Sequence, residues 1–235
     1  MAFELFHTIN SGLYIRLGDS VIFIDGLHTG RRFGLSDTPA EVLAQAEGDG
    51  TAFRYNTLLL FTHCHDDHYD EELAEKFMSR HPGTKLFFPG ESRGLEVSMT
   101  EEGIYRFDHG PFTVHAFPTT HQGGKIMQTA HFSYLVSAGE ASLLHCGDAR
   151  LNDDMVLRIK DLAGDGPGDV FLNVYHLNTE KEQRLIRLLS PRRCLINHLP
   201  LPADDENGFC AMAREALETV KGVGRLEMLD PMSAV

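Results

Sequence analysis

Residues 62–68 read Thr-His-Cys-His-Asp-Asp-His, and this stretch decides the fold prediction for the whole chain. An apolar segment, Thr57–Phe61, comes directly before it, and a predicted helix, Asp70–Arg80, comes directly after it. Side chains alternate between the two sides of an extended segment, so His63 and His65 should point the same way. Three imidazoles and two carboxylates in so short a stretch are unfavourable at a strand end unless a cation holds them.

As the chain turns into the helix, Asp67 and His68 can point into the same space as His63 and His65. This geometry suits two adjacent divalent ions, one for each pair of side chains. Imidazole and carboxylate are ligands that zinc accepts, and iron or manganese remain open. A helix-capping role would explain one aspartate but not three histidines. Cys64 alternates to the other side, and we expect it to point inward as a small buried apolar residue.

The predicted strands are apolar runs rich in β-branched and aromatic residues. They are Gly12–Leu17, Val21–Asp25, Thr57–Thr62, Thr84–Phe88, Phe112–Pro118, Phe132–Ser137, Ser142–Cys146, Val170–Tyr175 and Cys194–Asn197. Capping signals and helical spacing predict helices between some of them. These begin after Thr38, with Pro39 in the first turn, cover Asp70–Arg80 and Asn152–Leu162, follow Thr179 up to Pro191, and cover Phe209–Val220.

Strands come first, then strands alternating with helices, and the same succession follows once more. Two β-rich halves that each carry helices indicate an α/β (α+β) chain with two sheets packed face to face and helices outside, a four-layer αβ/βα sandwich. A single doubly wound sheet is the alternative. With 235 residues, 42% of them hydrophobic, and no linker or repeat, residues 1–235 are expected to form a single domain.

The charge and composition exclude several function classes. A net charge of −13 repels phosphate backbones and anionic lipid, so we expect no nucleic-acid and no membrane partner. Apolar runs such as Leu58–Phe61 are far shorter than the ~20 residues of a membrane span. The four cysteines lie far apart and no export signal is visible, which predicts reduced thiols and a cytoplasmic location.

Residues of the metal-binding type recur directly after other predicted strands. They are Asp25, His121, Asp148 and His198. An α/β scaffold gathers its site along one edge, where its strands end. The sequence therefore predicts that these side chains share one site with residues 62–68.

With these residues in this order along the sequence, the chain resembles the metallo-β-lactamase superfamily. Its motifs are matched by Asp25, by His63-x-His65-x-Asp67-His68, and by His121, Asp148 and His198. The match runs from residue 25 to residue 198, and a complete dinuclear pattern in register is far more specific than a lone His-x-His. The resemblance implies the metallo-β-lactamase fold, with a two-metal site on its edge.

The resemblance also implies a role for each motif residue. His63, His65 and His121 would hold the first ion, and Asp67, His68 and His198 the second. Asp148 would bridge the two ions. Asp25 would orient ligand imidazoles through hydrogen bonds rather than bind metal.

The function implied is a metal-dependent hydrolase of a small ester, lactone or phosphoester, most similar to the small cytoplasmic lactonase-like branch. Its nucleophile would be a hydroxide that bridges two divalent ions, most readily Zn, with Mn or Fe as alternatives, and that Asp67 and Asp148 orient. His65 stands where the oxygen-reducing branch carries a glutamate, which favours hydrolysis. The alternatives are a phosphodiesterase or nuclease of the same superfamily, and a non-catalytic metal-dependent sensor or binding module.

Three residues near the motifs are predicted to contact a small-molecule substrate: His28, Lys125 and Arg150. His28 belongs to the loop at residues 26–37, which follows Asp25 and could reach the site. The ordinary alternative for the two basic residues is a solvated surface charge. A homo-oligomer is left open.

Overall fold

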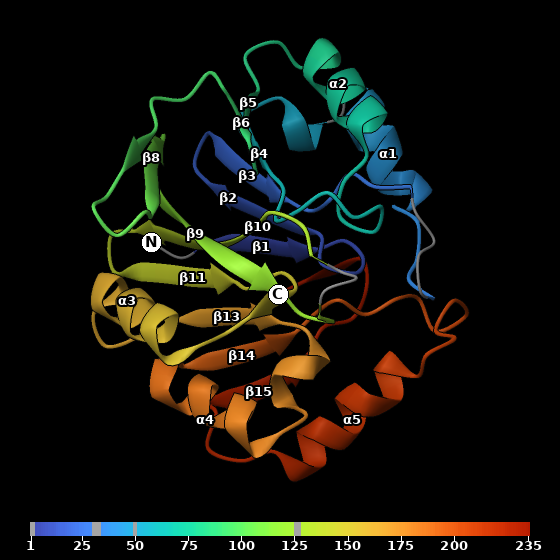
Figure 1. Cartoon of the computed structure of the whole chain (residues 1–235). Coiled ribbons are helices and arrows are strands. Elements are labelled where there is room, and N and C mark those ends of the chain that lie inside the picture. Colours follow the sequence, from blue (N-terminus) through green and yellow to red (C-terminus); the bar gives the residue numbers. More distant parts are fainter. Residues whose placement is uncertain (1–2, 30–33, 49–50, 125–127) are drawn as a thin grey trace.

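Two β-sheets pack face to face in the computed structural model, with helices on both outer sides (Figure 1). The structure describes residues 3–29, 34–48, 51–124 and 128–235. In spatial order the first sheet consists of β16 (Ser233–Ala234), β1 (Glu4–His7), β2 (Leu13–Leu17), β3 (Ser20–Ile24), β4 (Asn56–Leu60), β5 (Lys85–Phe88) and β6 (Glu91–Arg93).

The second sheet runs from the parallel strands of the C-terminal half to antiparallel strands at its far edge. Its order is β15 (Arg225–Met228), β14 (Arg193–Ile196), β13 (Asp169–Leu172), β11 (Ala141–His145), β10 (His131–Ala138), β9 (Phe112–His121), β8 (Tyr105–His109) and β7 (Ser98–Met99). The short strand β12 (Ala149–Arg150) pairs with the end of β9.

Helices α1 (Ala40–Glu47) and α2 (Glu71–Arg80) cover the first sheet. Helices α3 (Asp153–Ala163), α4 (Glu180–Leu189) and α5 (Phe209–Thr219) cover the second sheet. The predicted four-layer sandwich is confirmed, and the alternative of one doubly wound sheet is wrong.

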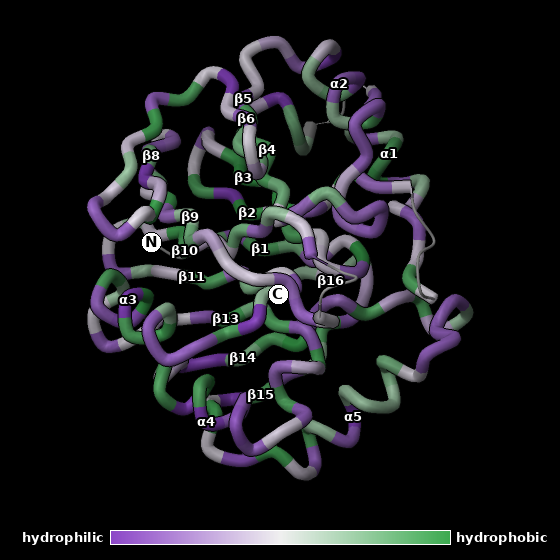
Figure 2. The backbone as a smooth tube through the Cα atoms, viewed as in Figure 1, coloured by the Kyte–Doolittle hydropathy of each residue, from purple (hydrophilic) through white to green (hydrophobic). Residues whose placement is uncertain are grey.

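The central strands consist mainly of apolar residues, as expected for strands with both faces buried. Leu58 and Leu60 of β4 point into the core between the sheets, whereas Leu59 and Phe61 pack beneath α1 and α2. In Figure 2, hydrophobic residues are frequent along the central strands, and hydrophilic residues are frequent in the connections between elements. The burial of these runs holds the strand ends, and therefore the loops of the site, in place.

The local predictions were confirmed in part. Thr179 caps α4 by accepting a hydrogen bond from the Glu182 N–H. Thr38, in contrast, does not cap α1, because its hydroxyl accepts from the His28 N–H and donates to the Gly26 carbonyl. The predicted strand over Val170–Tyr175 was too long: β13 ends at Leu172, and a 3-10 turn over Val174–Leu177 follows.

Among the described residues, no helix combines the length and the apolar character that crossing a membrane requires.

Replacing Leu58 tests the core between the sheets. Leu58→Ala removes a side chain with 0% exposure, and we expect the free energy of unfolding to fall by about 2–5 kcal/mol because a cavity remains. Leu157→Ala on α3 is the control: Leu157 is 48% exposed, and its replacement should change the free energy by less than about 1 kcal/mol. Urea unfolding measures both. Equal destabilisation by the two variants would contradict the assignment of Leu58 to the shared core.

Candidate metal centre

One edge of the sandwich collects the polar residues that follow its strands. The loop from β4 to α2 carries His63, His65, Asp67 and His68, and the other three residues come from the second sheet. These are His121 at the end of β9, Asp148 between β11 and β12, and His198 two residues after the end of β14. The structure therefore brings together all seven residues that the resemblance implied as metal ligands.

The first group consists of His63, His65 and His121, all buried or nearly so. One ligand atom from each lies within 4.8 Å of the others. His63 Nε2 and His65 Nδ1 are 2.9 Å apart. Three imidazoles that turn ring nitrogens toward one point are a typical donor set for a divalent transition metal.

The second group consists of Asp67, His68, Asp148 and His198, and its ligand atoms also lie within 4.8 Å of one another. His198 Nε2 is 3.2 Å from His68 Nε2 and 3.2 Å from Asp67 Oδ2. Ligands of a tetrahedral zinc, bound at ~2.0–2.1 Å, are themselves roughly 3.3–3.4 Å apart. The observed separations match that spacing.

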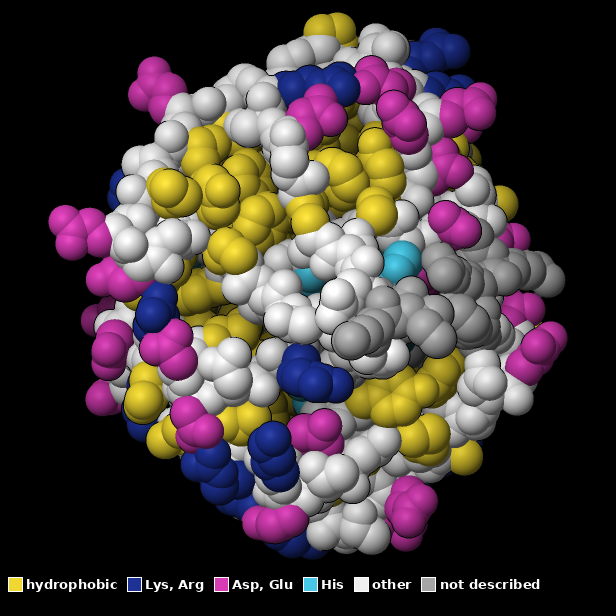
Figure 3. Space-filling view, in the orientation of Figure 1, with side chains coloured by type: hydrophobic (Ala, Val, Ile, Leu, Met, Phe, Trp, Pro, Cys, Tyr) yellow, Lys and Arg dark blue, Asp and Glu magenta, His cyan; other side chains and the backbone are white. Residues whose placement is uncertain are grey.

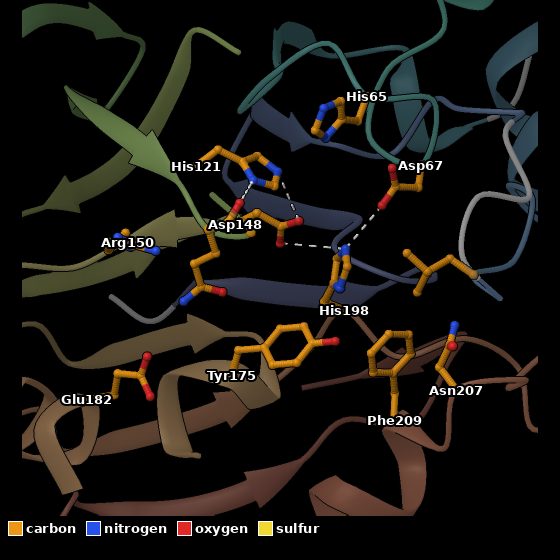
Figure 4. Close-up of a pocket in the computed structure, with 13 residues that line it drawn as sticks. His65, Asp67, His121, Asp148, Arg150, Tyr175, Glu182, His198, Asn207 and Phe209 are labelled. Atoms are coloured by element: carbon orange, nitrogen blue, oxygen red, sulfur yellow. Dashed lines mark hydrogen bonds and ion pairs between the residues drawn. The ribbon is translucent and has the colours of Figure 1, made fainter. Parts of the chain in front are cut away.

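Asp148 connects the two groups (Figure 4). Its Oδ2 lies 3.5 Å from His121 Nε2 and 3.7 Å from His68 Nε2. Its Oδ1 lies 3.6 Å from His198 Nε2. The carboxylate therefore lies between the two clusters of ligands, which is the position that the bridging role requires.

Hydrogen bonds on the outer side of the rings fix which nitrogen faces inward. The Nδ1–H of His68 donates to Asp25 Oδ2 at 2.8 Å, so loss of the Nε2 proton would leave a lone pair that points toward the cluster. Asp25 is itself held by the N–H and the hydroxyl of Thr62, each at 2.7 Å. This is the position expected for a residue that orients a ligand.

His121 is oriented in the same way. Its Nδ1–H donates to the Gln122 carbonyl, while its buried Nε2 has no hydrogen-bond partner and faces the Asp148 carboxylate. A nitrogen lone pair and a carboxylate oxygen are both acceptors, so they need a cation or a proton between them. The donor set therefore fits a pair of divalent ions.

The electrostatics of the cluster favour a cation. Burial alone would raise the pKa of Asp148, but His198, His121 and His68 hold that pKa well below its ordinary value. Burial alone would lower the pKa of His68, but Asp67, Asp25 and Asp148 raise it well above the usual value for histidine. Ionised carboxylates thus surround this ring and create a strongly negative environment.

Sequence reasoning missed two residues that hold Asp148. The buried His131 accepts the Asp148 N–H on its Nε2 at 3.0 Å, and its Nδ1 lies 2.5 Å from the Thr119 hydroxyl. Asn173 donates from Nδ2 to Asp148 Oδ1 at 2.9 Å. Only the pairing of β10 with β9, which places His131 opposite Thr119, could have indicated the role of this histidine.

A cavity of about 530 Å³ opens onto the cluster. Its lining residues are Leu35, His65, Asp67, His121, Gln122, Gly123, Asp148, Arg150, Tyr175, Glu182, His198, Asn207 and Phe209. Histidine side chains are visible near the centre of this face in Figure 3. The cavity gives a small molecule direct access to ligand atoms from both groups.

The predicted substrate contacts divide into three cases. Arg150 lines the cavity. His28 does not: it is 0% exposed and lies outside the lining, so the structure does not support a substrate contact there. Lys125 lies outside the described residues.

Cys64 is exposed, and its Sγ lies 3.0 Å from the Thr129 hydroxyl, so the predicted inward direction is wrong. The side opposite His63 faces solvent because the chain has already left the sheet at this point.

No family model and no curated protein matched the sequence. The fold, however, matches solved structures. Igni18, a metallo hydrolase from the archaeon Ignicoccus hospitalis, matches with a TM-score of 0.64 and 18% identity, over 99% of this chain and 97% of Igni18. YhfI of Bacillus subtilis, a metallo-β-lactamase fold protein, matches with a TM-score of 0.58 and 13% identity, over 100% of this chain and 99% of YhfI.

A third match is CmlA, a diiron β-hydroxylase from Streptomyces venezuelae, with a TM-score of 0.61 and 14% identity, over 99% of this chain and 54% of CmlA. Together these similarities show that the chain has the metallo-β-lactamase fold, as the sequence predicted. They do not resolve the lactonase-like branch, which stays a prediction.

Because His131 accepts the Asp148 N–H while buried, we expect it to make the stability of the fold depend on pH. Burial lowers the pKa of His131 from 6.5 to about 3. Between these values the unfolded chain binds one more proton at this position than the folded chain, so folding becomes less favourable as the pH falls. The free energy of unfolding should therefore fall by about 1.4 kcal/mol for each pH unit because of His131. We expect His131→Gln to lack this part of the slope, since a Gln side chain does not titrate. Its amide oxygen can still accept the Asp148 N–H.

Urea unfolding of EDTA-treated protein between pH 6.5 and 4.5 measures this slope without a contribution from metal release. Identical slopes for the native chain and His131→Gln would show that His131 is protonated in the folded state.

Proposed function

We propose that this protein is a dinuclear metal-dependent hydrolase of a small ester, lactone or phosphoester. The observation that carries the proposal is the position of Asp148, whose carboxylate lies between the two groups of buried ligands, with Oδ2 near His121 of the first group and His68 of the second. A cavity leads directly to this carboxylate. The likeness to Igni18, a metallo hydrolase, supports the same reaction class.

His63, His65 and His121 would hold one ion, Asp67, His68 and His198 would hold the other, and Asp148 would bridge them. Divalent ions bound here would supply Lewis acidity, polarising a substrate oxygen and lowering the pKa of a water toward neutrality. We propose Zn as the metal because imidazole nitrogens dominate the donor set, with Mn or Fe as alternatives.

The protein's own contribution is to hold charged groups in fixed positions. Asp25 fixes the ring of His68, and His131 and Asn173 fix Asp148. Burial alone would raise the pKa of Asp67, but His68 and His198 lower it, so its carboxylate stays ionised at neutral pH. Ionised Asp67 and Asp148 would orient an attacking water by accepting its hydrogen bonds.

The net charge of −13 supports a small-molecule substrate rather than a nucleic acid, because a polyanion would be repelled at long range. The cytoplasmic location and the oligomeric state stay predictions. The same fold is also found in a diiron hydroxylase, so the likeness to Igni18 alone does not decide the reaction, and the donor set is the second support for hydrolysis.

Replacing Asp148 tests the proposal. Asp148→Asn keeps the size of the side chain but removes the charge that the two groups share, so we expect fewer than two bound metal equivalents. The hydrolysis rate should fall at least about 100-fold. The control Asp154→Asn changes an aspartate whose side chain is 73% exposed on α3, and it should bind and react like the native chain.

Elemental analysis and rates with p-nitrophenyl esters, simple lactones and bis-p-nitrophenyl phosphate provide the measurements. Two metals and an unchanged rate in Asp148→Asn would remove this residue from the bridging role. Turnover of the phosphodiester alone would favour the phosphodiesterase alternative. A metal-replete protein that is inert to the whole panel would favour the sensor or binding module.

A further inference from the structure

The cavity above the cluster has two chemically different sides. One side is apolar and consists of Leu35, Tyr175 and Phe209. The rings of Tyr175 and Phe209 meet edge to face with centroids 6.0 Å apart, and Phe209 also contacts the ring of His198 at 6.4 Å. An apolar wall therefore begins at a ligand of the second group and continues outward from it.

The other side carries Arg150, which β12 places next to the end of β9. Figure 4 shows Arg150 and Phe209 on opposite sides of Asp148 and His198. Within the described part of the chain, the Arg150 guanidinium has no hydrogen bond or ion pair, although Glu182 lines the same cavity. Glu182 instead accepts a hydrogen bond from the Thr179 hydroxyl.

A second cavity of about 300 Å³ adjoins the first and shares Gln122, Arg150 and Glu182 with it. Lys181 and Asp153 also line this side cavity, and Asp153 is already paired with Arg184. The side-chain oxygen of Gln122 is buried without a hydrogen-bond partner. The side cavity thus offers unpaired polar groups at the point where it joins the metal centre.

We propose that the substrate of the hydrolase is an amphiphilic monoanion whose scissile bond lies between an apolar group and a carboxylate. The apolar group packs on Leu35, Tyr175 and Phe209, and the carboxylate binds Arg150 through charge-assisted hydrogen bonds. A monoanion suits the site better than a phosphate dianion because Glu182 lies in the same wall. This inference rests on the proposed function for the reaction and names the class of molecule that reacts.

Three esters test the apolar wall and Arg150 separately. Monobenzyl glutarate carries both a benzyl group and a carboxylate, benzyl butyrate lacks the carboxylate, and monomethyl glutarate lacks the ring. With zinc-loaded protein, kcat/KM for monobenzyl glutarate should exceed each of the other two values about tenfold. Equal kcat/KM values for all three esters would overturn the proposal while leaving hydrolysis established.

Variants test whether Arg150 causes the preference for a carboxylate and whether Tyr175 contributes to the preference for a benzyl group. Arg150→Gln should lower kcat/KM for monobenzyl glutarate about tenfold, and Arg150→Lys should restore part of the loss because it restores the charge without the planar fork. Arg106→Gln is the control, since Arg106 is exposed on β8 and pairs with Asp108. Tyr175→Ala should reduce the advantage of the benzyl ester over the methyl ester. Tyr175 is 41% exposed, so this change leaves the core intact.

Binding of a non-hydrolysable probe separates the pocket from the reaction. 4-Phenylbutyrate should bind about tenfold more tightly than 4-phenylbutanamide, and Arg150→Gln should abolish this difference in both zinc-loaded and EDTA-treated protein. A preference seen only with zinc would mean that the carboxylate binds metal, which contradicts the proposal. Arg150-dependent binding without hydrolysis of any ester would support the pocket and contradict the proposed function.

Discussion

The centre depends on one electrostatic constraint: ionised carboxylates and imidazole lone pairs face each other away from water. Asp67 is 4% exposed and Asp148 is 9% exposed, and ring nitrogens lie 3.2–3.7 Å from their oxygens. Groups of this kind cannot be buried unless a positive charge compensates them. Divalent cations at the two clusters would satisfy this requirement for all seven residues together. The loops around the site are shaped to maintain this arrangement.

Backbone conformation at the strand ends shows how closely these loops are constrained. Asp25 and His198 both adopt positive φ values, 47° and 59°, one residue after the end of β3 and two residues after the end of β14. Gly147, directly before Asp148, has φ 55°, and a Cβ there would lie 2.8 Å from Thr62 Cγ2 and 2.9 Å from His131 Nε2. Conformations that are unfavourable for most residues persist only where the surroundings enforce them. Here they redirect the chain so that side chains from two sheets meet.

The sequence predicted what depends on local pattern and on short motifs. Apolar runs such as Thr57–Phe61 indicated strands, and residues 62–68 indicated a metal site. Cys64 was placed on the wrong side because alternation says which residues share a side, but not whether that side faces solvent. His131 could not be found from sequence, because its contact with Asp148 depends on the pairing of β10 with β9. Contacts of this kind arise only from tertiary structure.

The fold alone does not determine the chemistry, since it is shared by a metallo hydrolase and a diiron hydroxylase. The restraint on Asp148 is more informative. His131 holds its backbone N–H, Asn173 holds Oδ1, and Oδ2 faces His121 and His68. A carboxylate fixed at both its backbone and its side chain has little freedom to swing between the clusters. Such rigidity suits a reaction in which two ions keep a constant separation, and hydrolysis requires no change in oxidation state that would alter it.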